Sequence, residues 1–355
     1  MIKRIKVDNL NKRASYDLTF HPDLNILTGK NGCGKTTLLK LTWYLVSGNF
    51  DKIFEELTFD YVLLETDDDG IIEIKTNQNE QDKKVEFKCI SPSRGINFTA
   101  EFPNLGQGID IGRIHIIDSS LFFPTFRRIE GGFSINSRAR GVRYSRANNI
   151  IREALDQISD NLTTDFQHKF IASISTEDIN YLLSNKYADI SESLRKLESV
   201  QSTEILNLVA QSIDKEKESL QKIRNIVRDN DQVREEILKP FTILSEIVDK
   251  IFKDKSIRIS GNIELGQAKN AIISDKLSAG EKQMLSFLCY NFFYDNSAIF
   301  IDEPELSLHT DWQRLLFPTL LKQNKNNQFF IATHSPFIYS KYPEKEIIIN
   351  QDKGE

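Results

Sequence analysis

Residues 29–36 carry the clearest chemical pattern in this sequence. They read Gly-Lys-Asn-Gly-Cys-Gly-Lys-Thr and match the phosphate-loop pattern G-x-x-x-x-G-K-[ST] at every fixed position. The loop follows the short strand-like run 24–27 and precedes a helix expected over residues 36–47. A glycine-rich turn in that context aims backbone N–H groups and the positive end of a helix dipole at one point. We therefore predict that the loop holds a triphosphate.

Each residue type in the loop has an expected role. The glycines let the backbone approach the phosphates, Lys35 reaches the β and γ oxygens, and the Thr36 hydroxyl is placed for Mg²⁺. Cys33 is expected to be a small tolerated residue. The predicted nucleotide-binding residues are Gly29, Lys30, Asn31, Gly32, Cys33, Gly34, Lys35, Thr36 and Thr37.

Two carboxylates stand where a buried strand is expected to end. The apolar run 298–301 is typical of a central strand, and it continues into Asp302-Glu303-Pro304-Glu305. Buried carboxylates are costly unless they serve a cation or a proton. We predict that Asp302 joins Thr36 at Mg²⁺ and that Glu303 activates the attacking water. 

His334 ends the next predicted strand, 329–333. A lone histidine is usually structural, but one at the tip of a core strand beside the nucleotide suits a γ-phosphate contact. The predicted catalytic residues are therefore Glu303, His334 and Lys35.

Residues 277–283 read Leu-Ser-Ala-Gly-Glu-Lys-Gln and open a predicted helix. One interpretation is a capping box alone, in which Ser278 and Glu281 satisfy the first backbone donors reciprocally. The other is a phosphate-sensing helix start, because Gly280 permits close backbone approach to an anion.

Composition indicates a globular protein of one large or two modest domains. The chain has 355 residues, 39% hydrophobic and 27% charged, with a net charge of −5. No apolar stretch approaches the ~20 residues of a membrane span, so we expect a cytoplasmic protein with no membrane association. The three cysteines are widely spaced and favour neither a disulfide framework nor a zinc site.

Arginines concentrate between residues 127 and 152, where seven stand against one acidic residue. They are Arg127, Arg128, Arg138, Arg140, Arg143, Arg146 and Arg152. One interpretation is a solvated surface; the other is an electropositive patch for nucleic acid, nucleotide or an acidic partner.

The periodicity divides the chain into three predicted segments. Residues 1–144 form a β-rich N-terminal lobe with the phosphate loop, 145–256 a helical insertion or arm, and 257–355 a C-terminal lobe. Expected strands lie at 2–7, 16–20, 24–27, 61–65, 71–75, 85–90, 98–102, 111–117 and 347–349, with a hairpin at 257–265. The insertion, folded out and back, reaches at most about 75 Å at 1.5 Å per residue.

These motifs, in this order, resemble an ABC-type ATPase head of the branch that includes Rad50, SMC and RecF heads and OLD-family ATPases. The resemblance equates 29–36 with Walker A, 277–283 with the signature, 299–303 with Walker B, 305–309 with the D-loop and 332–336 with the switch histidine. The phrase Asp302-Glu303-Pro304-Glu305-x-x-Leu308-His309-x-x-Trp312-Gln313 is most similar to prokaryotic defence ATPases of the OLD, retron, Septu and PARIS groups. The fold implied is an α/β P-loop ATPase head with a short helical insertion.

The sequence also departs from that family. No glutamine follows Phe123 where a Q-loop stands, so that role is unassigned. Two alternatives stay open: Arg127 or Arg128 replaces the glutamine, or the coupling differs. Few residues follow His334, so we expect no Toprim nuclease domain. An ABC transporter ATPase fits the 305–313 phrase poorly.

The resemblance implies an ATP hydrolase that uses ATP and Mg²⁺ and pairs head to tail with a second copy, or assembles further. In each composite site the signature residues Ser278, Ala279, Gly280, Glu281 and Gln283 come from the opposite subunit. Three functions stay open: a defence sensor or scaffold that controls a separately encoded effector, a repair or recombination head that clamps nucleic acid through Arg138, Arg140, Arg143 and Arg146, and an assembly module with negligible turnover.

Overall fold

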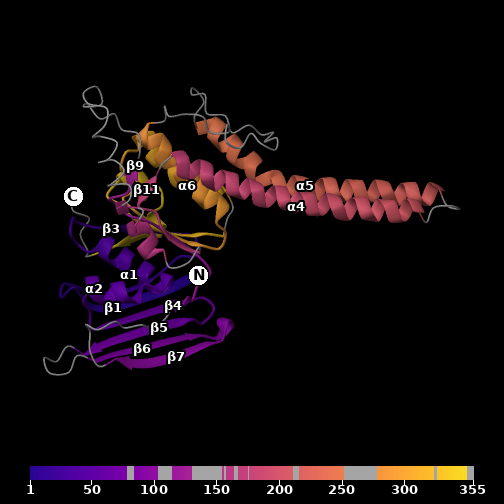
Figure 1. The fold of residues 1–355 in the computed structure, drawn as a ribbon. Helices are drawn as coiled ribbons and strands as arrows, with labels where there is room; N and C mark the ends of the chain where they lie inside the picture. Colours follow the sequence, from indigo (N-terminus) through magenta and orange to yellow (C-terminus); the bar gives the residue numbers. More distant parts are fainter. Residues whose placement is uncertain are drawn as a thin grey trace, which may run out of the picture. The chain divides into compact units, whose positions relative to one another are not determined.

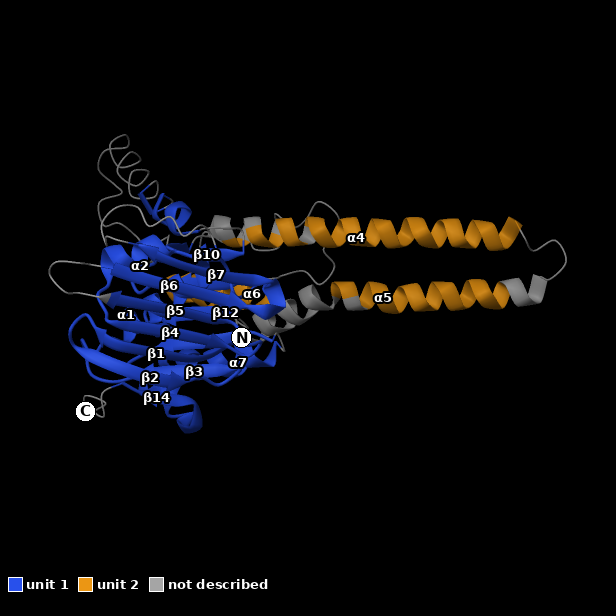
Figure 2. Ribbon diagram, turned by 90° about the horizontal axis from the view of Figure 1, so that it is seen from below, with its two compact units in different colours: residues 1–174, 294–355 blue, residues 175–293 orange. Residues whose placement is uncertain are grey.

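The computed structural model describes residues 1–77, 84–102, 114–129, 154–155, 157–163, 167–174, 176–210, 216–251, 278–323 and 326–349. The chain divides into two compact units, which Figure 2 colours separately. Unit 1 comprises Met1–Ile174 and Tyr294–Glu355, and unit 2 comprises Ser175–Phe293.

Unit 1 contains an antiparallel sheet of six strands in the order β2-β1-β4-β5-β6-β7 (Figure 1). The strands are β1 (Ile2–Leu10), β2 (Ala14–Thr19), β4 (Tyr61–Thr66), β5 (Ile71–Asn77), β6 (Lys84–Ser91) and β7 (Ile96–Phe102). Apolar and polar residues alternate along them, so that Val85, Phe87 and Cys89 of β6 are buried while their neighbours face outward. One face of this sheet therefore covers the core.

The second sheet of unit 1 is parallel throughout and has the order β10-β8-β12-β13-β3-β14. Its strands are β3 (Leu24–Thr28), β8 (Ser120–Phe123), β10 (His168–Phe170), β12 (Ala298–Asp302), β13 (Gln328–Ala332) and β14 (Glu346–Ile348). Strands β3, β12 and β13 are buried at every residue, as expected for strands covered on both faces. Because the strands are parallel, the loops after β3, β8, β12 and β13 leave from one edge.

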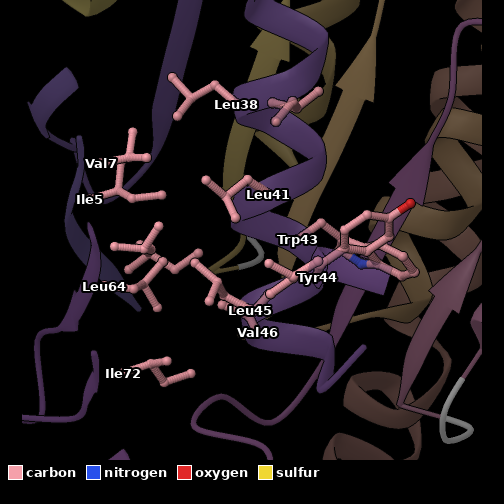
Figure 3. Packing of buried hydrophobic residues seen from close by; sticks show 14 of the residues in the cluster. Ile5, Val7, Leu38, Leu41, Trp43, Tyr44, Leu45, Val46, Leu64 and Ile72 are labelled. Atoms are coloured by element: carbon pink, nitrogen blue, oxygen red, sulfur yellow. The ribbon is translucent and has the colours of Figure 1, made fainter. Parts of the chain in front are cut away.

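Helix α1 (Lys35–Ser47) lies between the two sheets, and every residue from Leu41 to Ser47 is buried. Figure 3 shows Leu41 and Leu45 facing Ile5, Val7 and Leu64 of the antiparallel sheet. Trp43 points elsewhere, and its ring lies 5.3 Å from that of Phe122 in the parallel sheet. The second half of the helix is therefore covered on both sides, as expected for a segment that is apolar on more than one face.

Gln328 connects the two sheets through its side-chain amide. Its Oε1 accepts from the N–H of Ile2 at 2.8 Å, and its Nε2 donates to the carbonyls of Ile2 at 2.7 Å and His21 at 2.8 Å. This fully buried amide fixes the first strand of one sheet against the first residue of β13 in the other.

Unit 1 also contains the helices α2 (Phe50–Glu56), α7 (Thr310–Lys322) and α8 (Pro336–Tyr339) and the 3₁₀ turns η1 (Pro92–Arg94) and η3 (Pro343–Lys345). Residues 154–155 and 157–162 are helical as well. Strands β9 (Arg128–Ile129) and β11 (Ser173–Ile174) form a small parallel pair.

Unit 2 is helical. Helices α4 (Thr176–Ala210) and α5 (Glu216–Ile251) run side by side, and α6 (Ala279–Phe293) packs with both. At 1.5 Å per residue, the 35 residues of α4 make a helix of roughly 50 Å. In the described part of the chain, no helix is long and apolar enough to cross a membrane.

The predicted α/β fold and most of the predicted strands are confirmed, with two corrections. Of the strand expected at 111–117, the structure describes residues 114–117, and these are not in a strand. The strand that this part of the chain contributes to the parallel sheet is β8, which begins at Ser120. The helical pattern expected from residue 145 onward is interrupted by β10 and β11, which are only three and two residues long and too short to show a period. The hairpin expected at 257–265 lies outside the described residues.

Candidate functional site

The phosphate-loop sequence forms the turn between β3 and α1. Gly34 caps α1 in the left-handed conformation with φ 99°, and no side chain caps the first turn of the helix. A Cβ on Gly34 would lie 2.9 Å from Tyr16 Oη, so the position requires glycine on two grounds. The uncapped N–H groups at the start of α1 are the donors that suit an anion.

Tyr16 of β2 forms a hydrogen bond with this loop. Its hydroxyl donates to the Cys33 carbonyl at 2.8 Å, and burial raises the pKa of the phenol. Because Tyr16 belongs to the antiparallel sheet, that sheet helps to set the loop's conformation.

Lys35 is almost fully buried and its ammonium lies inside the loop. Its Nζ donates to the carbonyls of Gly29 at 2.8 Å and Lys30 at 3.1 Å, and lies 3.7 Å from Cys33 Sγ. Gly29 and Lys30, which were predicted to bind the nucleotide, hold the lysine through their carbonyls and are not among the residues that line the cavity described below.

Thr36 and Asp302 meet at the edge of the parallel sheet. The Thr36 hydroxyl donates to Asp302 Oδ1 at 3.1 Å, and the Thr125 hydroxyl donates to Asp302 Oδ2. Hydroxyl and carboxylate oxygens are the donors that Mg²⁺ prefers, so these side chains fit the predicted metal.

Glu303 follows Asp302 in an unusual backbone conformation. Its φ is 49°, in the left-handed region, and its N–H donates to the Ala332 carbonyl at 2.8 Å. Burial raises the pKa of its carboxyl, and the charges of Asp302 and Glu305 raise it further, whereas His334 and Lys35 lower it. A carboxyl with a raised pKa is a stronger proton acceptor once ionised.

Glu305 ties the end of β12 to the histidine that follows β13. Its Oε1 accepts from Thr333 Oγ1 at 2.8 Å and from the N–H groups of His334 at 2.8 Å and Ser335 at 3.1 Å. The His334 side chain itself is exposed.

A cavity of about 610 Å³ brings most of the predicted residues together. It is lined by residues 31–37 of the loop, by Asp302 and Glu303, and by His334. Residues widely separated in the chain, predicted separately from three motifs, therefore face one space large enough for a nucleotide.

The sequence-based interpretation missed the side of the cavity that belongs to the β1–β2 hairpin. Leu10, Asn11, Arg13, Ala14 and Tyr16 line it. These residues carry no recognisable motif, and only the packing of one sheet against α1 places them there. Thr125 was also missed, because a hydroxyl after a strand has no distinctive spacing.

Arg127 does not line this cavity, in contrast to the expectation of a Q-loop substitute near the γ-phosphate. Its side chain is buried, with an exposed fraction of 7%, and it donates only to backbone carbonyls in the bonds described below. For Arg128 the structure describes the backbone alone, in β9.

The predicted signature residues begin α6 in unit 2. Ser278 N donates to Glu281 Oε2 at 2.7 Å and Glu281 N donates to Ser278 Oγ at 3.4 Å, which is the reciprocal capping box. Ser278 is exposed, whereas Gly280, Glu281 and Gln283 are buried. The capping interpretation and the phosphate-sensing one remain compatible, because the cap leaves the helix start facing solvent at Ser278.

Arg138, Arg140, Arg143, Arg146 and Arg152 lie outside the described residues. Among the residues that the structure describes, no group of three or more histidine, cysteine or acidic side chains could hold a metal ion by itself.

Comparison with known proteins gives a family model that matches residues 24–340. Its description is "AAA domain, putative AbiEii toxin, Type IV TA system". The match includes the phosphate loop, Asp302, Glu303 and His334.

Three relatives share parts of the sequence. The Retron Vc95 probable ATPase of Vibrio cholerae is 26% identical over 188 residues, which cover 46% of this chain and 36% of the relative. The Retron Ec83 probable ATPase of Escherichia coli is 33% identical over 97 residues, covering 21% of this chain and 18% of the relative. The DNA replication and repair protein RecF of Clostridium acetobutylicum is 30% identical over 101 residues, covering 28% and 27%. The predicted resemblance to defence and repair ATPase heads is confirmed, although the chain spans little more than a third of these relatives at most.

The cavity position of Arg13 generates a first prediction. Arg13→Ala should weaken nucleotide binding by roughly 10- to 150-fold, because a charge-assisted hydrogen bond contributes about 1.5–3 kcal/mol. Titration with a fluorescent nucleotide measures the dissociation constant. The control is Lys12→Ala, one residue away in the same turn and not among the residues that line the cavity. Equal affinities of the two variants would remove Arg13 from the site.

Proposed function

The chain belongs to this family of AAA ATPase domains, and we propose that ATP binds in the cavity beside α1, closes two copies into a dimer, and so controls a separately encoded effector in anti-phage defence. The observation that carries the proposal is the single cavity lined by residues 31–37, Asp302, Glu303 and His334. Phosphate donors, metal ligands and a proton acceptor face the same space there.

Most of the chemistry is positioning. Lys35 and the N–H groups at the start of α1 bind the phosphates, and Thr36 and Asp302 hold Mg²⁺, which neutralises phosphate charge. Glu303 orients the attacking water and accepts its proton, while His334 contacts the γ-phosphate. The raised pKa of Glu303 suits this role, since proton transfer is most efficient when the acceptor's pKa is near the working pH.

The dimer follows from the signature residues Ser278, Ala279, Gly280, Glu281 and Gln283. We expect the start of α6 in one copy to complete the ATP site of the other. Because ATP binds the closed pair more tightly than a single copy, it stabilises the pair by mass action, and hydrolysis removes the γ-phosphate that holds it. The proposal includes Mg²⁺, a dimer or a higher oligomer, and a cytoplasmic location. It also includes the division of the chain into lobes 1–144 and 257–355 around an insertion at 145–256.

The defence role is supported by the two relatives named as retron ATPases. The separately encoded effector is part of this proposal and comes from the resemblance to defence ATPases described above. 

A repair or recombination ATPase that clamps nucleic acid is the second candidate. The match to RecF favours it, together with the arginines between residues 127 and 152. A third candidate, an assembly module that binds ATP with negligible turnover, is distinguished by measuring turnover alone.

Glu303→Gln tests the proton acceptor. The variant should bind ATP normally and hydrolyse it at least about a hundredfold more slowly, because an amide cannot accept the proton while Asp302 still holds Mg²⁺. Steady-state phosphate release and dimer formation by light scattering are the measurements, and the dimer should accumulate. Lys35→Ala should instead lose ATP binding, and Glu101→Gln on β7 is the control for the chemical change. Unchanged turnover in Glu303→Gln would remove Glu303 from this role.

Mixing two inactive variants tests whether the site is shared. Ser278→Arg should bind ATP as a monomer but block closure, whereas Lys35→Ala lacks its own phosphate contact. A mixture should recover about one active site per heterodimer, measured as phosphate release against mixing ratio. Ser202→Arg on the exposed face of α4 is the control. If the mixture is no more active than either variant alone, then either the ATP site is not shared between two copies or the two sites of a dimer do not act independently.

The nucleic-acid candidate is tested by ATPase rate and DNA affinity across a salt series. For a DNA clamp, the affinity should fall steeply as salt rises, because counterions are released on binding. Joint replacement of Arg138, Arg140, Arg143 and Arg146 by glutamate should then abolish DNA binding and spare basal turnover. If the same variant keeps DNA-independent turnover but loses a co-purifying protein, the defence role is favoured instead.

A further inference from the structure

The side chain of Arg127 contacts the main chain at Asp302 and Glu303, two residues that line the cavity. Its Nη1 donates to the carbonyls of Pro124 at 2.9 Å and Asp302 at 2.7 Å, and its Nη2 donates to the carbonyl of Glu303 at 2.9 Å. The Asp302 carbonyl belongs to the peptide before the Cα of Glu303, and the Glu303 carbonyl to the peptide after it. One guanidinium therefore holds both peptide planes on either side of Glu303.

The conformation held in this way is one that glutamate rarely adopts. A φ of 49° places Glu303 in the left-handed region, where L-residues other than glycine, asparagine and aspartate are uncommon. Glu303 also precedes Pro304, and a residue before proline is biased toward extended backbone. Such strain persists only where surrounding contacts over-determine it, and it concentrates at functional sites.

The remaining contacts of this segment point the same way. The Glu303 N–H donates to Ala332, and the Thr125 hydroxyl, two residues before Arg127, donates to the Asp302 carboxylate. Burial lowers the pKa of Arg127 to about 10 although the Asp302, Glu305 and Glu303 charges oppose that shift, so the group stays cationic at neutral pH. The turn after β8 is thus joined to the end of β12 by hydrogen bonds from the side chains of Thr125 and Arg127.

We propose that Arg127 is a positioning residue, which aims the Glu303 carboxylate into the cavity by holding the two peptides that flank it. The proposal rests on the role proposed above for Glu303 as proton acceptor. It replaces the expectation that Arg127 contacts the γ-phosphate.

Arg127→Lys is the sharpest test, because lysine keeps the charge but cannot present a planar fork to two peptides. The variant should bind ATP within about twofold of the wild type, since it leaves Lys35, Thr36 and the start of α1 intact. Its kcat should fall by roughly 10- to 100-fold, the size of effect that a misplacement near 1 Å produces. Arg94→Lys, which alters an arginine paired with Asp118 on the surface, is the matched control and should behave as wild type.

A double-variant cycle separates positioning from general destabilisation. In the Glu303→Gln background, Arg127→Lys should cause little further loss of turnover, because there is no longer a carboxylate to aim. Urea unfolding of each variant, followed by the change in tryptophan fluorescence, reports on stability independently. If Arg127→Lys does not fold, Arg127→Gln, which carries no buried charge, is measured in the same cycle.

The outcomes distinguish the positioning role of Arg127 from the proton-acceptor role of Glu303 on which it rests. If Glu303→Gln slows turnover but Arg127→Lys leaves kcat unchanged, or lowers it equally in both backgrounds, the positioning role is overturned and the proton-acceptor role stands. A rise in the ATP dissociation constant that accounts for the whole loss would also overturn it, in favour of a phosphate contact. Unchanged turnover in Glu303→Gln would overturn both.

Discussion

The burial of α1 between two sheets is the constraint on which the candidate site depends. Every residue from Leu41 to Ser47 is buried, so the last two turns of the helix have no face in contact with water. The antiparallel sheet takes one side, through residues such as Ile5 and Leu64, and the parallel sheet takes the side of Trp43. A helix held on both sides cannot rotate or slide, so the N–H groups of its first turn stay at one place. The N–H groups that we expect to bind phosphate are thus positioned by hydrophobic packing at the other end of the helix.

The parallel sheet supplies the second condition. Neighbouring strands β3, β12 and β13 all end at the same edge, which brings Lys35, Asp302 and His334 together although some 300 residues separate the first from the last. Ends of parallel strands are where α/β folds usually bind ligands. The antiparallel sheet contributes as well, because Tyr16 contacts the loop and Arg13 lines the cavity. Gln328, which bonds to Ile2, keeps the two sheets in the relation that this shared site requires.

A common feature of the site is that charged side chains hold backbone. Lys35 donates to the carbonyls of its own loop, Arg127 donates to the carbonyls around Glu303, and Glu305 accepts from the N–H groups of His334 and Ser335. Each of these bonds fixes a main-chain segment whose neighbouring side chain is expected to act on the nucleotide. Preorganisation of this kind leaves little to rearrange during phosphoryl transfer, where positioning and charge account for most of the rate. It also makes the site sensitive to residues that do not touch the substrate.

The sequence by itself determined the chemistry and most of the elements. The loop 29–36, the carboxylates that follow an apolar run, and His334 after the next run were recognisable because phosphate binding and buried strands demand particular residue types at particular spacings. The β-rich runs 2–7, 61–65, 71–75 and 85–90 predicted strands, and the structure has β1, β4, β5 and β6 there. Short strands such as β10 and β11 were missed, since two or three residues show no period. Only the tertiary structure decided that Arg127 is buried beneath Glu303, that Thr125 meets Asp302, and that Arg13 borders the cavity. These contacts join residues that are distant in the chain. Those of Arg127 and Thr125 depend on the pairing of β8 with β12, and the place of Arg13 depends on how the antiparallel sheet packs against α1, which no local pattern records.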